Sequence, residues 1–92
     1  MKKPNVTIYY NPTCPYCHMA LEFFANELPD ITLEKIELNG GEGKNHDLFL
    51  KALNKCEFEM HGIPLIVIGE KCFQGFNEET ANQIKQVLNH ND

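Results

Sequence analysis

Hydrophobic positions near the start of the chain follow two different spacings. Residues 6–10, VTIYY, are mostly β-branched or aromatic and are followed by Asn11-Pro12, which is typical of a strand that ends in a turn. Beyond the turn, apolar residues recur at intervals of three and four, at Cys17, Ala20, Leu21, Phe24 and Leu28. This spacing is one face of an α-helix, so we predict a helix that begins at or next to Cys14 and that Pro29 ends.

The next part of the chain predicts one more strand, one more helix and a hairpin. Residues 31–38 are rich in β-branched side chains and precede Asn-Gly-Gly, which favours a strand that ends there. A second helix is predicted within residues 44–58, where four side chains have helical spacing: Phe49, Ala52, Leu53 and Cys56. The apolar run 65–68, a turn at residues 69–71 and a short strand after it indicate a hairpin whose first strand is buried on both faces.

A third helix completes the pattern. Asn77 is a suitable N-cap, acidic residues follow it, and an apolar stripe is formed by Ala81, Ile84 and Leu88. The first strand, helix and strand imply a parallel pair with a right-handed crossover. We therefore predict an α/β fold in the order β-α-β-α-β-β-α, with a mixed four-stranded sheet flanked by three helices. The 92 residues suffice for one such unit, and we expect a single domain over residues 1–92.

Composition narrows the classes of function. The formal net charge is -5, and the 8 basic residues are all lysines spread along the chain, so no basic stripe is present to bind nucleic-acid phosphates. The N-terminal apolar run is too short for the core of a signal peptide, and no apolar stretch is long enough to cross a bilayer. We therefore expect a cytoplasmic protein whose partners are neither nucleic acids nor membranes.

The sequence CPYC, from Cys14 to Cys17, carries the candidate chemistry. A thiol attacks as the thiolate, and the free N–H groups and dipole at a helix N-terminus stabilise that anion. Cys14 is placed there, with Pro15 in the first turn, whereas Cys17 falls one turn later on the buried stripe. The spacing predicts that Cys14 attacks a disulfide and that Cys17 resolves the mixed disulfide that forms. His18, four residues after Cys14, is interpreted as a solvated surface residue.

The same two cysteines are compatible with half of a zinc site, or with incidental packing. Zinc takes four ligands, and a second C-x-x-C would be the strong indication. The other cysteines form no such motif, and we predict that Cys56 is a buried thiol in the core. Cys72 is predicted to be a buried free thiol as well, and the alternative is an exposed thiol open to glutathionylation or to an intermolecular disulfide. A redox-active pair without a metal is thus the favoured interpretation, and a zinc or iron-sulfur binding or delivery module is the alternative.

Three segments together resemble the glutaredoxins of the thioredoxin-fold superfamily. They are CPYC after the first strand, Ile63-Pro64 at the start of a late strand, and FQGFN before the last helix. The resemblance covers nearly the whole chain and implies a thioredoxin fold, with a cis peptide bond at Ile63-Pro64 that faces Cys14 and leaves the Ile63 backbone free to pair with an extended substrate. It also implies a substrate-binding set: Thr13, Pro15, Tyr16, Ile63, Pro64, Gly75, Phe76 and Asn77. Tyr16 is expected to face outward because Cys17 faces inward.

The activity that the resemblance implies is that of a dithiol-disulfide oxidoreductase acting on protein disulfides or glutathione mixed disulfides. Glutathione would be a cosubstrate, supplied by the glutathione reductase system; no bound cofactor is needed, and we expect a monomer. Three departures from the glutaredoxin pattern favour a thioredoxin reductase as the alternative electron donor. Residues 61–64, HGIP, resemble the Gly-Ile-Pro of thioredoxins, no basic residue shortly precedes Cys14, and Gln74-Gly75 stands in place of a Gly-Gly pair.

Overall fold

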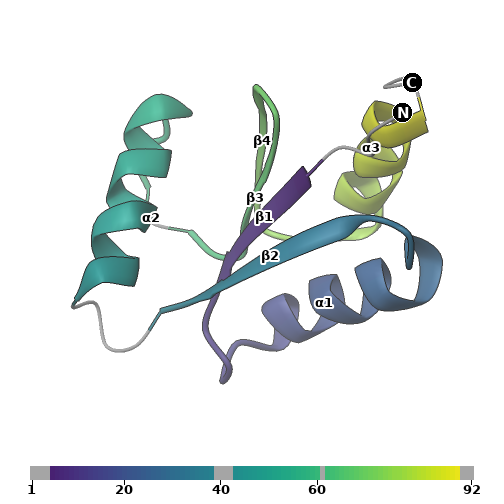
Figure 1. Ribbon diagram of the computed structural model, residues 1–92, viewed down its shortest axis with the longest axis horizontal. Helices are drawn as coiled ribbons and strands as arrows, with labels where there is room; N and C mark the ends of the chain where they lie inside the picture. Colours follow the sequence, from purple (N-terminus) through teal and green to yellow (C-terminus); the bar gives the residue numbers. More distant parts are fainter. Residues whose placement is uncertain (1–4, 39–42, 61, 90–92) are drawn as a thin grey trace.

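The computed structural model describes residues 5–38, 43–60 and 62–89 (Figure 1). Within these ranges the elements follow the predicted order. Their bounds are β1 Asn5–Tyr10, α1 Pro15–Glu27, β2 Thr32–Glu37, α2 Lys44–Lys55, β3 Leu65–Ile68, β4 Lys71–Gln74 and α3 Glu78–Asn89. The predicted turn at residues 39–41 lies outside the described residues. Among the residues described, no helix is both long and apolar enough to cross a membrane.

These strands form one mixed sheet in the order β2-β1-β3-β4. β1 and β2 are parallel, as expected for strands joined through a helix, while β3 is antiparallel to both β1 and β4. The register places Tyr9 opposite Leu65, where β1 ends and β3 begins. The loop that leaves β1 and the loop that enters β3 therefore lie at the same end of the sheet.

Each face of the sheet has its own hydrophobic core, because successive side chains of a strand point to opposite faces. Helices α1 and α3 cover one face, and α2 covers the other (Figure 1). On the α1–α3 face, alternate residues of the two central strands pack against both helices: Val6, Ile8, Ile66 and Ile68. On the α2 face, Phe49 and Leu53 pack against Tyr9 and Leu65. The first strand of the hairpin is therefore buried on both faces, as its continuous apolar run predicts.

Helix α2 is shorter than predicted. It ends at Lys55 with Cys56 as its C-cap, instead of continuing toward residue 58. Glu57 then adopts a positive φ of 61°, and the Phe58 N–H donates a hydrogen bond to the Leu53 carbonyl at 3.0 Å. This left-handed turn satisfies a carbonyl at the helix end, with a glutamate in the position that glycine usually takes.

The predictions that Cys56 and Cys72 are buried, unbonded thiols are wrong. Cys56 and Cys72 are half-buried and form a disulfide bond, with Cα atoms 6.0 Å apart. Because Cys56 caps α2 rather than continuing its apolar stripe, the bond joins the end of that helix to the edge strand β4.

Candidate active site

A tight turn leads from β1 to the first cysteine, and Asn11 organises it. The Asn11 Oδ1 accepts hydrogen bonds from the Thr13 backbone N–H at 2.9 Å and from the Thr13 hydroxyl at 2.7 Å. The Asn11 carbonyl accepts a bond from the Cys14 N–H at 3.0 Å. The sequence identifies Asn11 only as a turn residue, but its side chain also determines how the chain enters the helix at Cys14.

Cys14 is the N-cap of α1, as predicted. Its backbone is extended, with φ -90° and ψ 118°, and Pro15 occupies the first helical position. The Cys17 N–H donates to the Cys14 Sγ at 3.4 Å, and the first turn of α1 contains no acidic side chain. A negative charge on this half-buried sulfur is therefore stabilised by a backbone donor and by the helix dipole, without an opposing carboxylate in that turn.

Cys17 lies one turn further along α1 and is buried in the core. It is 1% exposed, and both it and Cys14 are free thiols. Burial raises the pKa of the Cys17 thiol from 9.0 to about 12, and the neighbouring Cys14 sulfur adds to the increase. At neutral pH, Cys17 is thus a protonated thiol shielded from external reagents, and Cys14 is the more accessible of the two sulfurs.

The cis peptide bond implied at Ile63-Pro64 is present. Pro64 is buried and leads directly into β3, so it lies at the same end of the sheet as the loop that carries Cys14. The Gly75 N–H donates a hydrogen bond to the Pro64 carbonyl at 2.8 Å, and Gly75 has a φ of +85°, which disfavours any residue with a side chain. The fold therefore places two of the predicted binding segments, 63–64 and 75–77, side by side.

Phe76 and Asn77 differ in how they are placed. Phe76 is 9% exposed and packs against Phe23 of α1 with ring centroids 5.4 Å apart, so its side chain belongs to the core. Asn77 is exposed and caps α3, with its Oδ1 accepting a hydrogen bond from the Thr80 N–H at 2.8 Å. Asn77 thus joins the surface beside Gly75, while the Phe76 side chain anchors that surface to α1.

Apolar side chains are exposed along α1 next to CPYC. Tyr16 faces outward, as predicted, and is 58% exposed; Met19 is 49% exposed. A groove of about 410 Å³ lies between α1 and α3, and its lining includes Met19, Phe23, Phe76 and Asn77. The same groove is also lined by three acidic residues, Glu22, Glu27 and Glu78, so the surface beside CPYC combines apolar and negatively charged side chains.

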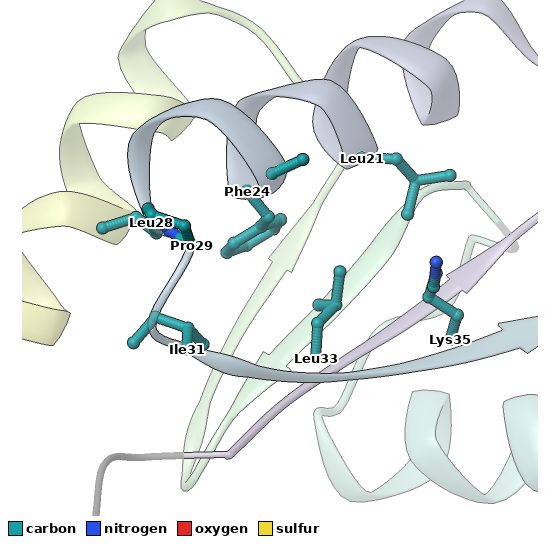
Figure 2. Close-up of a pocket in the computed structure, with 8 residues that line it drawn as sticks. Leu21, Phe24, Leu28, Pro29, Ile31, Leu33 and Lys35 are labelled. Atoms are coloured by element: carbon teal, nitrogen blue, oxygen red, sulfur yellow. The ribbon is translucent and has the colours of Figure 1, made fainter.

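A second hollow, of about 200 Å³, lies on the other side of α1, between this helix and β2. Figure 2 shows that it is lined by apolar side chains from Leu21 to Leu33, with Lys35 at the end away from Pro29. None of the predicted site residues lines it, so we do not include it in the candidate site.

The remaining predicted features are placed as follows. His18 is exposed on α1, and His61, to which the sequence assigns no role, lies outside the described residues. Within residues 5–38, 43–60 and 62–89, no group of three or more His, Cys, Asp or Glu side chains is arranged to hold a metal ion.

One contact that the sequence does not indicate is the hydrogen bond from Gln74 Nε2 to the Met60 carbonyl at 2.6 Å, which ties the segment before Ile63 to β4.

Comparison with solved structures finds redox proteins of one fold. A glutaredoxin from Archaeoglobus fulgidus matches with a TM-score of 0.67 and 28% identity, over 88% of this chain and 85% of that chain. Glutaredoxin 1 from Francisella tularensis, solved in complex with cacodylate, matches with a TM-score of 0.65 and 26% identity, over 91% of this chain and 96% of that chain. Thioredoxin O2 from Arabidopsis thaliana in its oxidised state matches with a TM-score of 0.60 and 18% identity, over 96% of this chain and 74% of that chain.

No protein-family model matches the chain, and no curated protein sequence matches it. The structural likenesses show that the chain has the thioredoxin fold, as the resemblance implies. The two glutaredoxins support a glutaredoxin-like assignment within that fold. The likeness to two glutaredoxins supports an oxidoreductase.

Proposed function

We propose that the chain is a dithiol-disulfide oxidoreductase in which Cys14 attacks and Cys17 resolves. The observation that carries this proposal is the asymmetry of the two thiols: Cys14 caps a helix N-terminus and accepts an N–H hydrogen bond, whereas Cys17 is buried one turn away. Only one of the two is suited to meet an external disulfide, and the other is close enough to attack the first.

The reaction proceeds in two exchanges. The Cys14 thiolate attacks one sulfur of the substrate disulfide, the substrate S–S bond breaks, and the first substrate thiolate leaves and takes up a proton. Cys17 then loses its proton and attacks the Cys14 Sγ, which releases the second substrate thiolate and leaves a Cys14–Cys17 disulfide. Two electrons pass to the substrate, and the oxidised pair must be reduced before the next cycle.

The high pKa of Cys17 also orders these steps. Part of the increase comes from the Cys14 sulfur, through a hydrogen bond and its charge. Once Cys14 is held in a mixed disulfide it no longer carries that charge, so these contributions to the pKa of Cys17 disappear while burial remains. Cys17 thus becomes a better nucleophile only after Cys14 has reacted.

Substrate binding is assigned to the surface around Cys14. The Ile63 backbone would pair with an extended polypeptide or with glutathione. Thr13 would contact the substrate from the turn before α1, Pro15 and Tyr16 would contact it from the first turn of α1, and residues 75–77 would close the other side. The exposure of Tyr16 and the bond from Gly75 to Pro64 support this assignment. The likeness to two glutaredoxins favours glutathione as the cosubstrate.

Two single substitutions test the mechanism. Cys14→Ser should abolish exchange with protein disulfides and with glutathione mixed disulfides, because the attacking sulfur is gone. Cys17→Ser should accumulate a covalent adduct with a protein disulfide while it still removes glutathione from a mixed disulfide. The control is Lys51→Ser, an exposed position on α2, which leaves all four cysteines in place. Equal activity of Cys14→Ser and Cys17→Ser in every assay would contradict the assigned roles.

The electron donor is tested with the oxidised protein. One reaction contains glutathione, glutathione reductase and NADPH, the other thioredoxin reductase and NADPH, and thiol trapping followed by mass measurement reports the state of Cys14 and Cys17. We expect reduction by glutathione. Reduction by the thioredoxin reductase alone would favour the alternative donor that the HGIP sequence suggests.

A further inference from the structure

The chain contains a second sulfur pair that the proposed cycle does not use. Cys56 caps the C-terminus of α2, Cys72 lies in β4, and their disulfide joins positions 16 residues apart. Both residues are half-buried, so a reductant can approach the bond. The segment that this bond encloses contains Ile63-Pro64, the proposed binding edge for substrate.

The enclosed segment is attached to β4 at two points. Cys72 holds its beginning through the disulfide, and Gln74, two residues along the same strand, holds Met60 by a hydrogen bond of 2.6 Å. Residues two apart in a strand point to the same face, so both attachments come from the α2 face of β4. At Gly62, a Cβ atom would lie 3.0 Å from the Gln74 side chain, which shows how closely the segment follows β4.

Phe58 and Ile63 pack against the core on the α2 face, but Glu59 and Met60 between them are exposed. Met60 is 75% exposed, so it contributes little apolar burial, and Glu57 holds a left-handed backbone. Local order in such a segment depends on the few bonds that fix it. The Cys56–Cys72 bond is the covalent attachment of this segment, and Cys56 lies seven residues before Ile63.

The position of Cys56 also distinguishes this pair from Cys14 and Cys17. Cys14 lies at a helix N-terminus, where backbone N–H groups favour a thiolate, but Cys56 lies at a helix C-terminus, where the dipole disfavours one. A disulfide whose reduced form lacks thiolate stabilisation is the harder one to reduce. The Cys56–Cys72 bond should therefore persist while Cys14 and Cys17 cycle.

We propose that Cys56–Cys72 is a second, reversible redox site that positions the Ile63-Pro64 segment, so that its reduction weakens the binding of extended disulfide substrates without changing the thiol chemistry of Cys14. The reductant is a dithiol: one of its thiolates attacks the bond, its second thiol displaces the remaining sulfur, and it leaves as a cyclic disulfide. Two electrons and two protons pass to Cys56 and Cys72. The effect on substrates rests on the proposed oxidoreductase function.

The first experiment is independent of activity. In Cys14→Ser/Cys17→Ser, only Cys56 and Cys72 can exchange, so dithiothreitol titration followed by maleimide trapping should show one reversible two-electron transition. Amide hydrogen exchange in residues 57–60 and 62–65 should be faster by at least about ten-fold in the reduced form than in the oxidised form, with β1 unchanged. Equal exchange in both forms would refute the positioning role, and failure to re-form the disulfide on oxidation would refute reversibility.

The second experiment separates binding from chemistry. For Cys56→Ser/Cys72→Ser we expect the KM for a peptide with an internal disulfide to increase by about five-fold or more, while the rate of Cys14 with a small aromatic disulfide stays within about two-fold of wild type. The matched control is Leu88→Ala, which truncates a buried side chain of α3 in the core on the opposite face of the sheet. An unchanged KM, or the same KM increase in Leu88→Ala, would overturn the proposal. If the wild type shows no activity, the proposed oxidoreductase function is contradicted. The amide hydrogen exchange experiment then decides the positioning role by itself.

Discussion

Burial of Cys17 should make its thiol much slower to react than an ordinary cysteine, and one variant isolates the effect. Cys14→Ser leaves Cys17 as the only free thiol, because Cys56 and Cys72 are held in a disulfide. The substitution removes the contributions of Cys14 to the raised pKa of Cys17 but keeps burial, which is the largest cause. The pKa of Cys17 should therefore stay well above 9.0 in the variant.

The size of the effect follows from the fraction of thiolate. At about pH 8, a thiol with a pKa of 9.0 is ionised to about one part in ten, and one with a pKa of about 12 to about one part in ten thousand. Ionisation alone thus slows alkylation by about a thousand-fold. Allowing for the lost contribution of Cys14, we expect Cys17 in Cys14→Ser to react at least about one hundred-fold more slowly when folded than when unfolded.

The assay is alkylation by iodoacetamide, followed by mass measurement, from about pH 7 to about pH 10 with and without urea. In the folded protein the rate should increase about ten-fold for each pH unit over the whole range, because the thiol stays mostly protonated. In urea the rate should level off near the ordinary pKa. A plateau near pH 9.0 in the folded protein, or a folded rate within about ten-fold of the unfolded rate, would show that burial does not protect this thiol.

Three further outcomes test the energetics. Folding raises the pKa of Cys17 from 9.0 to about 12, so the protonated thiol contributes stability that is complete below pH 9.0 and is lost as the pH rises toward 12. In guanidinium unfolding, the free energy of unfolding should therefore fall more steeply with pH above 9.0 in the wild type than in Cys17→Ala. Equal pH dependence in the two proteins would contradict this. Cys56→Ser/Cys72→Ser should lower the free energy of unfolding in urea by about 3 kcal/mol, because the disulfide closes a loop between residues 16 apart and so restricts the unfolded chain. A loss below about 1 kcal/mol would contradict this stabilising effect. Asn77→Ala should cost about 1 kcal/mol in thermal or urea unfolding because the Thr80 N–H loses its cap, whereas Asn77→Asp should keep most of the stability.

The fold could be predicted because its signals are local and agree with one another. The run at residues 65–68 has no polar position, and such a strand is stable only when both of its faces are covered. Helical spacing from Cys17 onward and a turn at Asn11-Pro12 place the start of α1 at Cys14, and Asn77 marks the start of α3. Each of these features depends on neighbours within a few residues, so the sequence alone was sufficient to identify them.

The end of α2 could not be predicted in the same way. Where a helix ends in a left-handed residue, that residue is usually glycine or sometimes asparagine, but here Glu57 takes the conformation. With no recognisable stop, the apolar spacing of Phe49, Leu53 and Cys56 suggested that Cys56 continued the buried stripe. Its real partner, Cys72, is brought near only when α2 packs over the sheet and β4 pairs with β3, which are tertiary events.

The Cys14–Cys17 pair therefore depends on local helix structure and the Cys56–Cys72 pair on tertiary packing, so the two pairs can be perturbed separately. Cys14 and Cys17 are placed by one helix turn, so their relation persists as long as the first turn of α1 forms. Cys56 and Cys72 are brought together by the packing of α2 on the sheet and by the pairing of β4 with β3. Replacing them therefore affects the segment before Ile63 and leaves the first turn of α1 intact. A change in substrate affinity in that variant, with the reactivity of Cys14 preserved, can therefore be assigned to the position of the binding edge rather than to the thiol that attacks.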